Sequence, residues 1–77
     1  MKQLTIVLLF SVIAFTSVAQ SPQRIEAMRM VQNGDNFLRS ARFEDAIAEY
    51  TNAITTDNSY ADAYMKRSAI YSRLGRT

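Results

Sequence analysis

The stretch FEDAIAEYTNAI, residues 43–54, determines the fold class of this chain. Its apolar side chains recur at every third or fourth position, namely Phe43, Ala46, Ile47, Tyr50, Ala53 and Ile54. This spacing places them on one face of an α-helix, which we predict over residues 43–56. Glu44 and Asp45 fall in its first turn, where negative charge interacts favourably with the helix dipole. A helix with one apolar face needs neighbouring elements to cover that face.

Two further helices are predicted on either side of this stretch. Ser21 and Pro22 are typical of a helix start, because a serine oxygen caps free amides and proline suits the first helical position. The helix that follows is predicted over residues 22–40. After the turn-forming residues 56–59, a third helix is predicted over residues 60–74, with Ser59 and Asp62 as a capping box. The pattern is helical throughout, so the predicted fold class is all-α.

Residues 27–43 are echoed 34 residues later in the chain. The matched pairs are Ala27 and Ala61, Met30 and Tyr64, Gly34 and Ser68, Phe37 and Tyr71, Arg39 and Arg73, and Arg42 and Arg76. A period of 34 residues is the length of one helix-turn-helix unit in a class of α-solenoids, whose stacked units present surfaces to other proteins. The echo therefore indicates a binding module.

These residues resemble a tetratricopeptide repeat, which consists of two antiparallel helices, A and B. Residues 43–54 are similar to helix B, with small residues at Ala46 and Ala53 and an aromatic residue at Tyr50. The resemblance implies a repeat core of Met30, Gly34, Phe37, Phe43, Ala46, Ile47, Tyr50, Ala53, Ile54, Tyr64, Ser68 and Tyr71. Gly34 and Ala46 are expected where two helices cross closely. Ala41 stands where the family often has glycine, so a positive φ there would be strained.

The resemblance also implies that the chain is an α-solenoid fragment of about one and a half repeats, and it gives the boundaries of each part. Residues 20–26 extend the first helix, residues 27–60 form the first repeat, and residues 61–77 form the first helix of a truncated second repeat. Solenoid units bury their apolar faces against neighbouring units. We therefore expect this sequence to be the N-terminal piece of a longer protein, or to self-associate through its third helix.

The N-terminus has the layout of a secretory signal peptide over residues 1–19. Lys2 is followed by an apolar run from Leu4 to Phe15 and then by small residues. Cleavage is expected between Ala19 and Gln20, which would place the mature protein in the periplasm or outside the cell. The alternative is an uncleaved hydrophobic leader helix that anchors the protein to the membrane.

Composition argues against catalysis. The chain has no cysteine and no histidine, so thiol and imidazole nucleophiles and the usual zinc ligands are absent. We predict no catalytic residue, no cofactor and no bound metal. Positive and negative charges nearly balance once Lys2 is removed, so the high isoelectric point does not indicate nucleic-acid binding. The expected partner is a protein or a peptide.

The resemblance places a concave peptide groove along the A helices. By position, the residues that face it are Met28, Val31, Gln32, Asp35, Leu38, Arg39, Asp62, Met65, Lys66, Ala69, Ser72 and Arg73. The strongest candidates for peptide contact are Gln32, Asp35, Arg39, Lys66 and Arg73. The sequence thus favours a non-catalytic scaffold or peptide-binding adaptor in the cell envelope. The alternative is the interaction domain of a larger envelope enzyme or signalling protein, whose catalytic part lies beyond residue 77.

Overall fold

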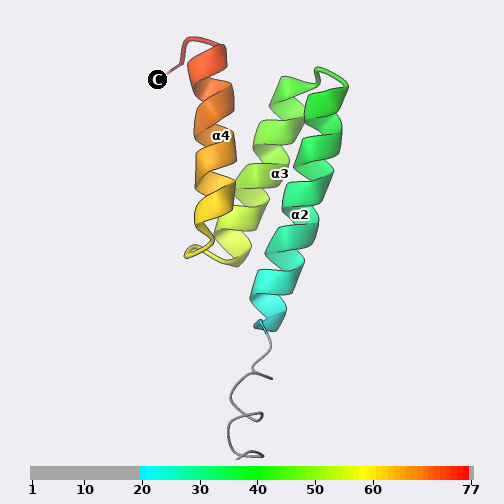
Figure 1. Ribbon diagram of the computed structural model, residues 1–77, viewed down its shortest axis with the longest axis vertical. Coiled ribbons are helices and arrows are strands. Elements are labelled where there is room, and N and C mark those ends of the chain that lie inside the picture. The colour runs from blue at the N-terminus through cyan, green and yellow to red at the C-terminus, as the bar shows by residue number, and fades with distance from the viewer. Residues whose placement is uncertain (1–19, 77) are drawn as a thin grey trace, which may run out of the picture.

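The computed structural model describes residues 20–76, which form three helices. They are α2 (Pro22–Arg39), α3 (Phe43–Thr56) and α4 (Ala61–Arg73). Helices α2 and α3 form an antiparallel hairpin, and α4 packs on α3 and runs antiparallel to it (Figure 1). The predicted all-α fold class is confirmed, and the predicted helix ends agree with the structure to within one residue. The proposed signal peptide lies outside the described residues.

The first helix starts as the sequence predicts, whereas the third does not. The Ser21 hydroxyl accepts a hydrogen bond from the Arg24 amide at 3.1 Å, and Pro22 occupies the first turn of α2. The predicted capping box of Ser59 and Asp62 is wrong. Tyr60 is the N-cap of α4 and makes no side-chain cap bond. The Ser59 hydroxyl instead donates to Asp57 at 2.8 Å, because the turn before α4 is organised around that carboxylate.

Helices α2 and α4 end in the same hydrogen-bonded motif. After α2, the Ala41 amide donates to the Leu38 carbonyl and the Arg42 amide donates to the Phe37 carbonyl, both at 2.9 Å. After α4, the corresponding bonds run from Gly75 to Ser72 and from Arg76 to Tyr71. This is the Schellman motif, which needs a residue in the left-handed conformation just after the helix. Gly75 has φ +73° and Ala41 has φ +60°, so the strain expected at Ala41 is present.

We expect Ala41→Gly to raise the free energy of unfolding by about 1 kcal/mol, because glycine adopts positive φ without the clash that a Cβ makes. Urea denaturation followed by circular dichroism measures the change. Ala48→Gly is the matched control. Ala48 is exposed within α3, where the same substitution should lower the free energy of unfolding by about 1 kcal/mol. A destabilising Ala41→Gly substitution would contradict this explanation of the turn.

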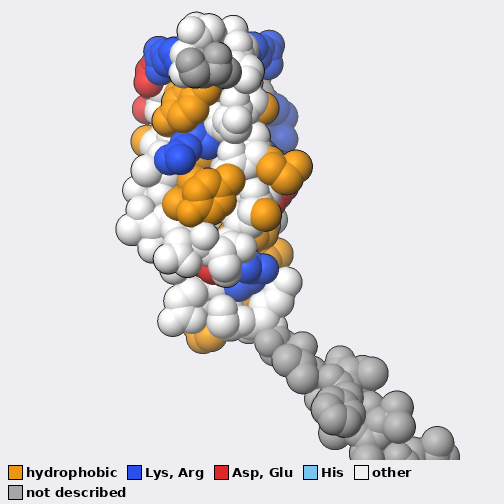
Figure 2. Space-filling view, turned by 90° about the vertical axis from the view of Figure 1, so that its left-hand side faces the viewer, with side chains coloured by type: hydrophobic (Ala, Val, Ile, Leu, Met, Phe, Trp, Pro, Cys, Tyr) orange, Lys and Arg blue, Asp and Glu red, His pale blue; other side chains and the backbone are white. Residues whose placement is uncertain are grey.

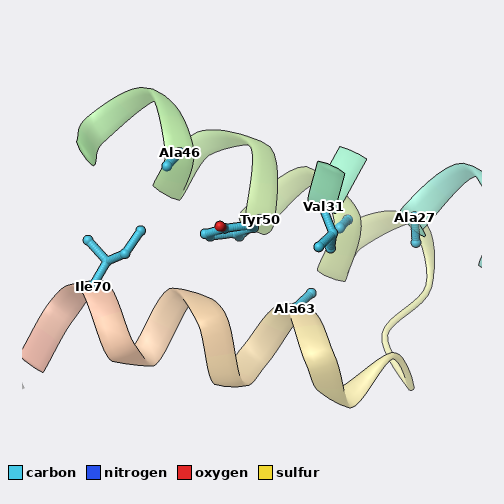
Figure 3. Close-up of a cluster of buried hydrophobic side chains, with 7 residues drawn as sticks. Ala27, Val31, Ala46, Tyr50, Ala63 and Ile70 are labelled. Carbon is cyan, nitrogen blue, oxygen red and sulfur yellow. The ribbon is translucent and has the colours of Figure 1, made fainter. Parts of the chain in front are cut away.

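The core lies where the three helices meet. Its buried residues are Ala27, Val31, Ala46, Tyr50, Ala53, Ala63 and Ile70. Figure 3 shows the Tyr50 ring between α3 and α4, with Val31 of α2 to one side of it; from α4, Ile70 is directed towards the ring and Ala63 towards Val31. Most of these side chains are small, so the helix backbones approach closely and the large ring of Tyr50 fills the remaining space.

The close crossing of α2 and α3 depends on Gly34. A Cβ atom at this position would lie 2.5 Å from Cε1 and 2.8 Å from Cδ1 of the Tyr50 ring. Tyr50 is fully buried and its hydroxyl is bonded to Asp35, so the ring could move aside only by disturbing the core and this hydrogen bond. Gly34 therefore faces the crossing rather than solvent, as do the buried residues Ala46 and Ala53.

The other residues assigned to the repeat core divide into two groups. Met30, Phe37, Phe43, Ile47 and Ile54 are partly buried and pack against the core. On α4, Tyr71 is half-buried, Ser68 is exposed and Tyr64 is 41% exposed. The equivalent positions of α2 are covered by α3, whereas no helix within residues 20–76 covers this face of α4. Figure 2 looks onto the α4 side, where hydrophobic side chains lie in separate patches with basic residues between them.

Candidate peptide-binding groove

A pocket of about 140 Å³ opens between α2 and α4, above α3. Helix α2 contributes Asp35 and Leu38, and α3 contributes Tyr50. The lining residues of α4 are Lys66, Ala69, Ile70 and Arg73. The pocket therefore combines apolar walls with charged groups, and all three helices are needed to form it.

Asp35 is the polar centre of this pocket. The Tyr50 hydroxyl donates a hydrogen bond to Oδ1 of Asp35 at 2.6 Å. The Lys66 ammonium donates to both carboxylate oxygens of Asp35, at 3.1 and 2.9 Å, and so forms an ion pair between α4 and α2. Asp62 lies 4.0 Å from the same ammonium. The Asp35 carboxylate thus binds one residue from each of the other two helices and joins α2, α3 and α4.

The hydrogen bonds that Tyr50 and Lys66 donate to Asp35 change the pKa values of both donors. The hydrogen bond with Asp35 raises the pKa of Lys66 above its usual value. Burial, and then the hydrogen bond with Asp35, raises the pKa of the Tyr50 hydroxyl. Both groups therefore keep their protons in the folded protein. As a result, Asp35 accepts hydrogen bonds from both of them at the pocket.

A family model described as a TPR repeat matches residues 34–75, which is more than half of the chain. The chain belongs to the tetratricopeptide-repeat (TPR) family. The matched residues include α3, α4 and the Gly34 crossing. No curated protein and no solved structure gives a significant match. TPR repeats are typically non-catalytic modules for protein–protein interaction, and this chain accordingly carries a protein-interaction module.

The repeat division predicted from the sequence takes α2 and α3 as the A and B helices of one repeat and α4 as the A helix of the next, and it stays a prediction. Within residues 20–76, no cluster of acidic side chains is arranged to hold a metal ion. None of the helices in that range is long and apolar enough to cross a membrane.

Three of the five candidate peptide contacts lie together in the pocket. Asp35, Lys66 and Arg73 all line it, but Asp35 and Lys66 bind each other. Gln32 and Arg39 are exposed and do not line the pocket. The Arg39 guanidinium donates to the Asn36 side chain on its own helix. Asp35 and Lys66 pair with each other, so Arg73 is the charged residue of the pocket lining whose guanidinium can still bind a carboxylate of a peptide.

The other positions predicted to face the TPR groove lie in different surroundings: some line the pocket, one belongs to the core and others are exposed. Leu38 and Ala69 line the pocket. Val31 is only 4% exposed and belongs to the core, whereas Met65 is 67% exposed. Tyr50 and Ile70 were not predicted as lining residues. The resemblance assigns Tyr50 to the repeat core but does not include Ile70 there. The structure buries both residues in the core and places them along the pocket.

We expect the free energy of unfolding to fall as the pH rises above 10. The raised pKa values of Tyr50 and Lys66 mean that the folded protein holds these protons more tightly than the unfolded chain, where the usual values are 10.0 and 10.5. The resulting stabilisation is complete below the usual values and is lost as the pH rises through the folded-state pKa values.

Urea denaturation at pH 8, 10 and 11 measures this loss. The double variant Tyr50→Phe/Lys66→Met lacks both groups and should show a flatter dependence on pH. An equally steep dependence in the double variant would assign the alkaline loss of stability to other residues.

Proposed function

We propose that this chain is an exported TPR module that binds a protein or peptide in the groove between α2 and α4. It would act as a non-catalytic scaffold or adaptor in the cell envelope. The pocket between the two A helices is the observation that supports this proposal, because it combines apolar walls with an arginine at its edge. Such concave sites suit an extended or helical peptide.

A blocking substitution tests the groove. Ala69 is exposed and lines the pocket, so the long side chain of Ala69→Arg would fill the space that a peptide needs. Ala48→Arg places the same side chain on the exposed surface of α3, outside the pocket, and is the control. We expect partners purified with the full chain from an envelope extract to be lost with Ala69→Arg and retained with Ala48→Arg. Retention of every partner by both variants would exclude this groove.

Export is supported by the basic residue, apolar run and small residues over residues 1–19. The mass of the protein recovered outside the cytoplasm tests this part of the proposal. A chain that begins at Gln20 agrees with a cleaved signal peptide. An intact N-terminus would instead favour a protein anchored by its leader.

Self-association is proposed as a second property of α4. Tyr64 is 41% exposed and Met65 is 67% exposed, and a second copy could cover this face. Sedimentation of the wild type and of Met65→Lys tests the proposal. A monomeric wild type across the micromolar range would exclude it.

A further inference from the structure

We propose that the pocket recognises an apolar side chain of leucine or phenylalanine size with a carboxylate close to it in the partner peptide, and that Arg73 binds the carboxylate. This inference rests on the proposed function and specifies the chemistry of the partner. Leu38, Ala69 and Ile70 supply the apolar contacts, and Arg73 stands beside them on the last turn of α4.

The size of the pocket sets the size of the apolar group. Its volume of about 140 Å³ is close to that of an engineered apolar cavity of about 150 Å³ that holds a benzene molecule. One leucine, methionine or phenylalanine side chain fits such a space, and an indole ring exceeds it. Ile70 is only 2% exposed, so a guest side chain would rest on a surface that is already fixed by the core.

The charges around the pocket favour an anion over a cation. Asp35, the one acidic residue of the lining, is bound by Lys66 and by the Tyr50 hydroxyl. A cationic guest would have to displace Lys66 to reach it. Lys66 neutralises Asp35, so Arg73 leaves the lining with a net positive charge.

Arg73 is arranged to accept a new partner. Among residues 20–76 it forms no ion pair with a carboxylate, in contrast to Arg24, Arg29, Arg42 and Arg76. Its guanidinium carbon lies 5.4 Å from the centre of the Phe43 ring. A cation–π contact with a ring uses none of the guanidinium N–H groups as hydrogen-bond donors to an acceptor atom, so a carboxylate can bind them through two hydrogen bonds.

A structural role for Arg73 predicts a different result from a recognition role. A basic residue in the last turn of a helix interacts favourably with the helix dipole, and this effect is independent of any ligand. Removing it would alter stability but would not change which peptides bind. A reversed preference for peptide charge is therefore the diagnostic observation.

The test uses the full chain and a positional library of peptides about nine residues long with leucine fixed at the central position. Glutamate, glutamine or lysine is placed in turn at each of the two positions on either side. At one of these positions we expect glutamate to bind about three- to tenfold more tightly than glutamine, and lysine to bind most weakly. Replacing the central leucine with alanine should weaken binding about tenfold or more, and tryptophan should not restore it.

Charge reversal gives the decisive comparison. Arg73→Glu should prefer lysine at the position where the wild type prefers glutamate. Arg29→Glu is the matched control, because Arg29 is an exposed arginine of α2 that pairs with Glu26 and does not line the pocket. It should keep the wild-type preference. If Arg73→Glu does not fold, Arg73→Gln should remove the difference between glutamate and glutamine.

The possible outcomes separate this inference from the function on which it rests. Peptides that bind with no dependence on charge, or an unchanged preference in Arg73→Glu, would overturn the role of Arg73 and leave peptide binding intact. The absence of binding by every leucine peptide, including the glutamate series, would overturn both the pocket specificity and the proposed peptide groove.

Discussion

Tyr50→Ala is expected to lower the free energy of unfolding by about 3–5 kcal/mol, the usual cost of removing a buried aromatic side chain. The Tyr50 side chain is fully buried, and its ring is the largest group at the meeting point of the three helices. Its removal leaves a cavity between Gly34 and Ile70 that the rigid helices cannot close. A domain of this size has a total free energy of unfolding on the order of 5 kcal/mol. The variant should therefore keep only about 0–2 kcal/mol and be partly unfolded at room temperature.

Circular dichroism and thermal denaturation measure this effect, and two controls define its cause. Tyr50→Phe keeps the ring and loses the hydrogen bond to Asp35, so we expect a smaller loss of about 1 kcal/mol. Tyr64→Ala removes the same type of side chain from an exposed position of α4 and should change stability little. Equal losses in Tyr50→Ala and Tyr64→Ala would contradict the assignment of Tyr50 as the centre of the core.

Gly34→Val is expected to lower the free energy of unfolding by about 3 kcal/mol, at the upper end of the usual range for overpacked cores. The first carbon of any side chain at this position would lie 2.5 Å from the Tyr50 ring. Relief requires either that α2 move away from α3 or that the ring leave its hydrogen bond with Asp35. The gain in helix propensity when glycine is replaced is less than 1 kcal/mol, which is too small to offset the clash.

The internal repeat supplies the matched control for this substitution. Ser68 occupies the position of Gly34 one period later and is exposed on α4. Ser68→Val should therefore change the free energy of unfolding by about 0.5 kcal/mol or less, as surface substitutions usually do. Urea denaturation of both variants makes the comparison. A similar effect at the two positions would show that the tight crossing at Gly34 does not limit stability.

Much of the fold could be predicted because it depends on local patterns. Apolar spacing defined the three helices, and Ser21 and Pro22 marked the start of the first. The place of Ala41 in the repeat indicated only that a positive φ would be strained there, and the structure shows that this positive φ is present. The capping prediction at Ser59 failed because Tyr60, one residue later, is the N-cap of α4, and the Ser59 hydroxyl donates to Asp57 within the turn.

The candidate site was only partly predictable. Asp35, Lys66 and Arg73, which the family resemblance places on the groove side of the A helices, line the pocket, and their contact with a peptide stays a prediction. Their phase did not indicate that Lys66 would bind Asp35, a residue 31 positions earlier in the chain. It also did not indicate that Tyr50, which the sequence assigns to the core, reaches the pocket floor. Both features depend on the distance and angle between helices, and the apolar pattern of one helix does not determine these quantities.

By itself the sequence determined the three helices, their apolar faces, the repeat period and the absence of thiol and imidazole chemistry, because each of these follows from residue type and short-range spacing. Tertiary structure alone decided which charged side chains remain available. The approach of α4 to α2 pairs Lys66 with Asp35 and leaves Arg73 without a carboxylate partner among residues 20–76. The physical reason is that an ion pair needs its atoms within a few ångströms, and only the packing of the helices sets distances between groups so far apart in the chain.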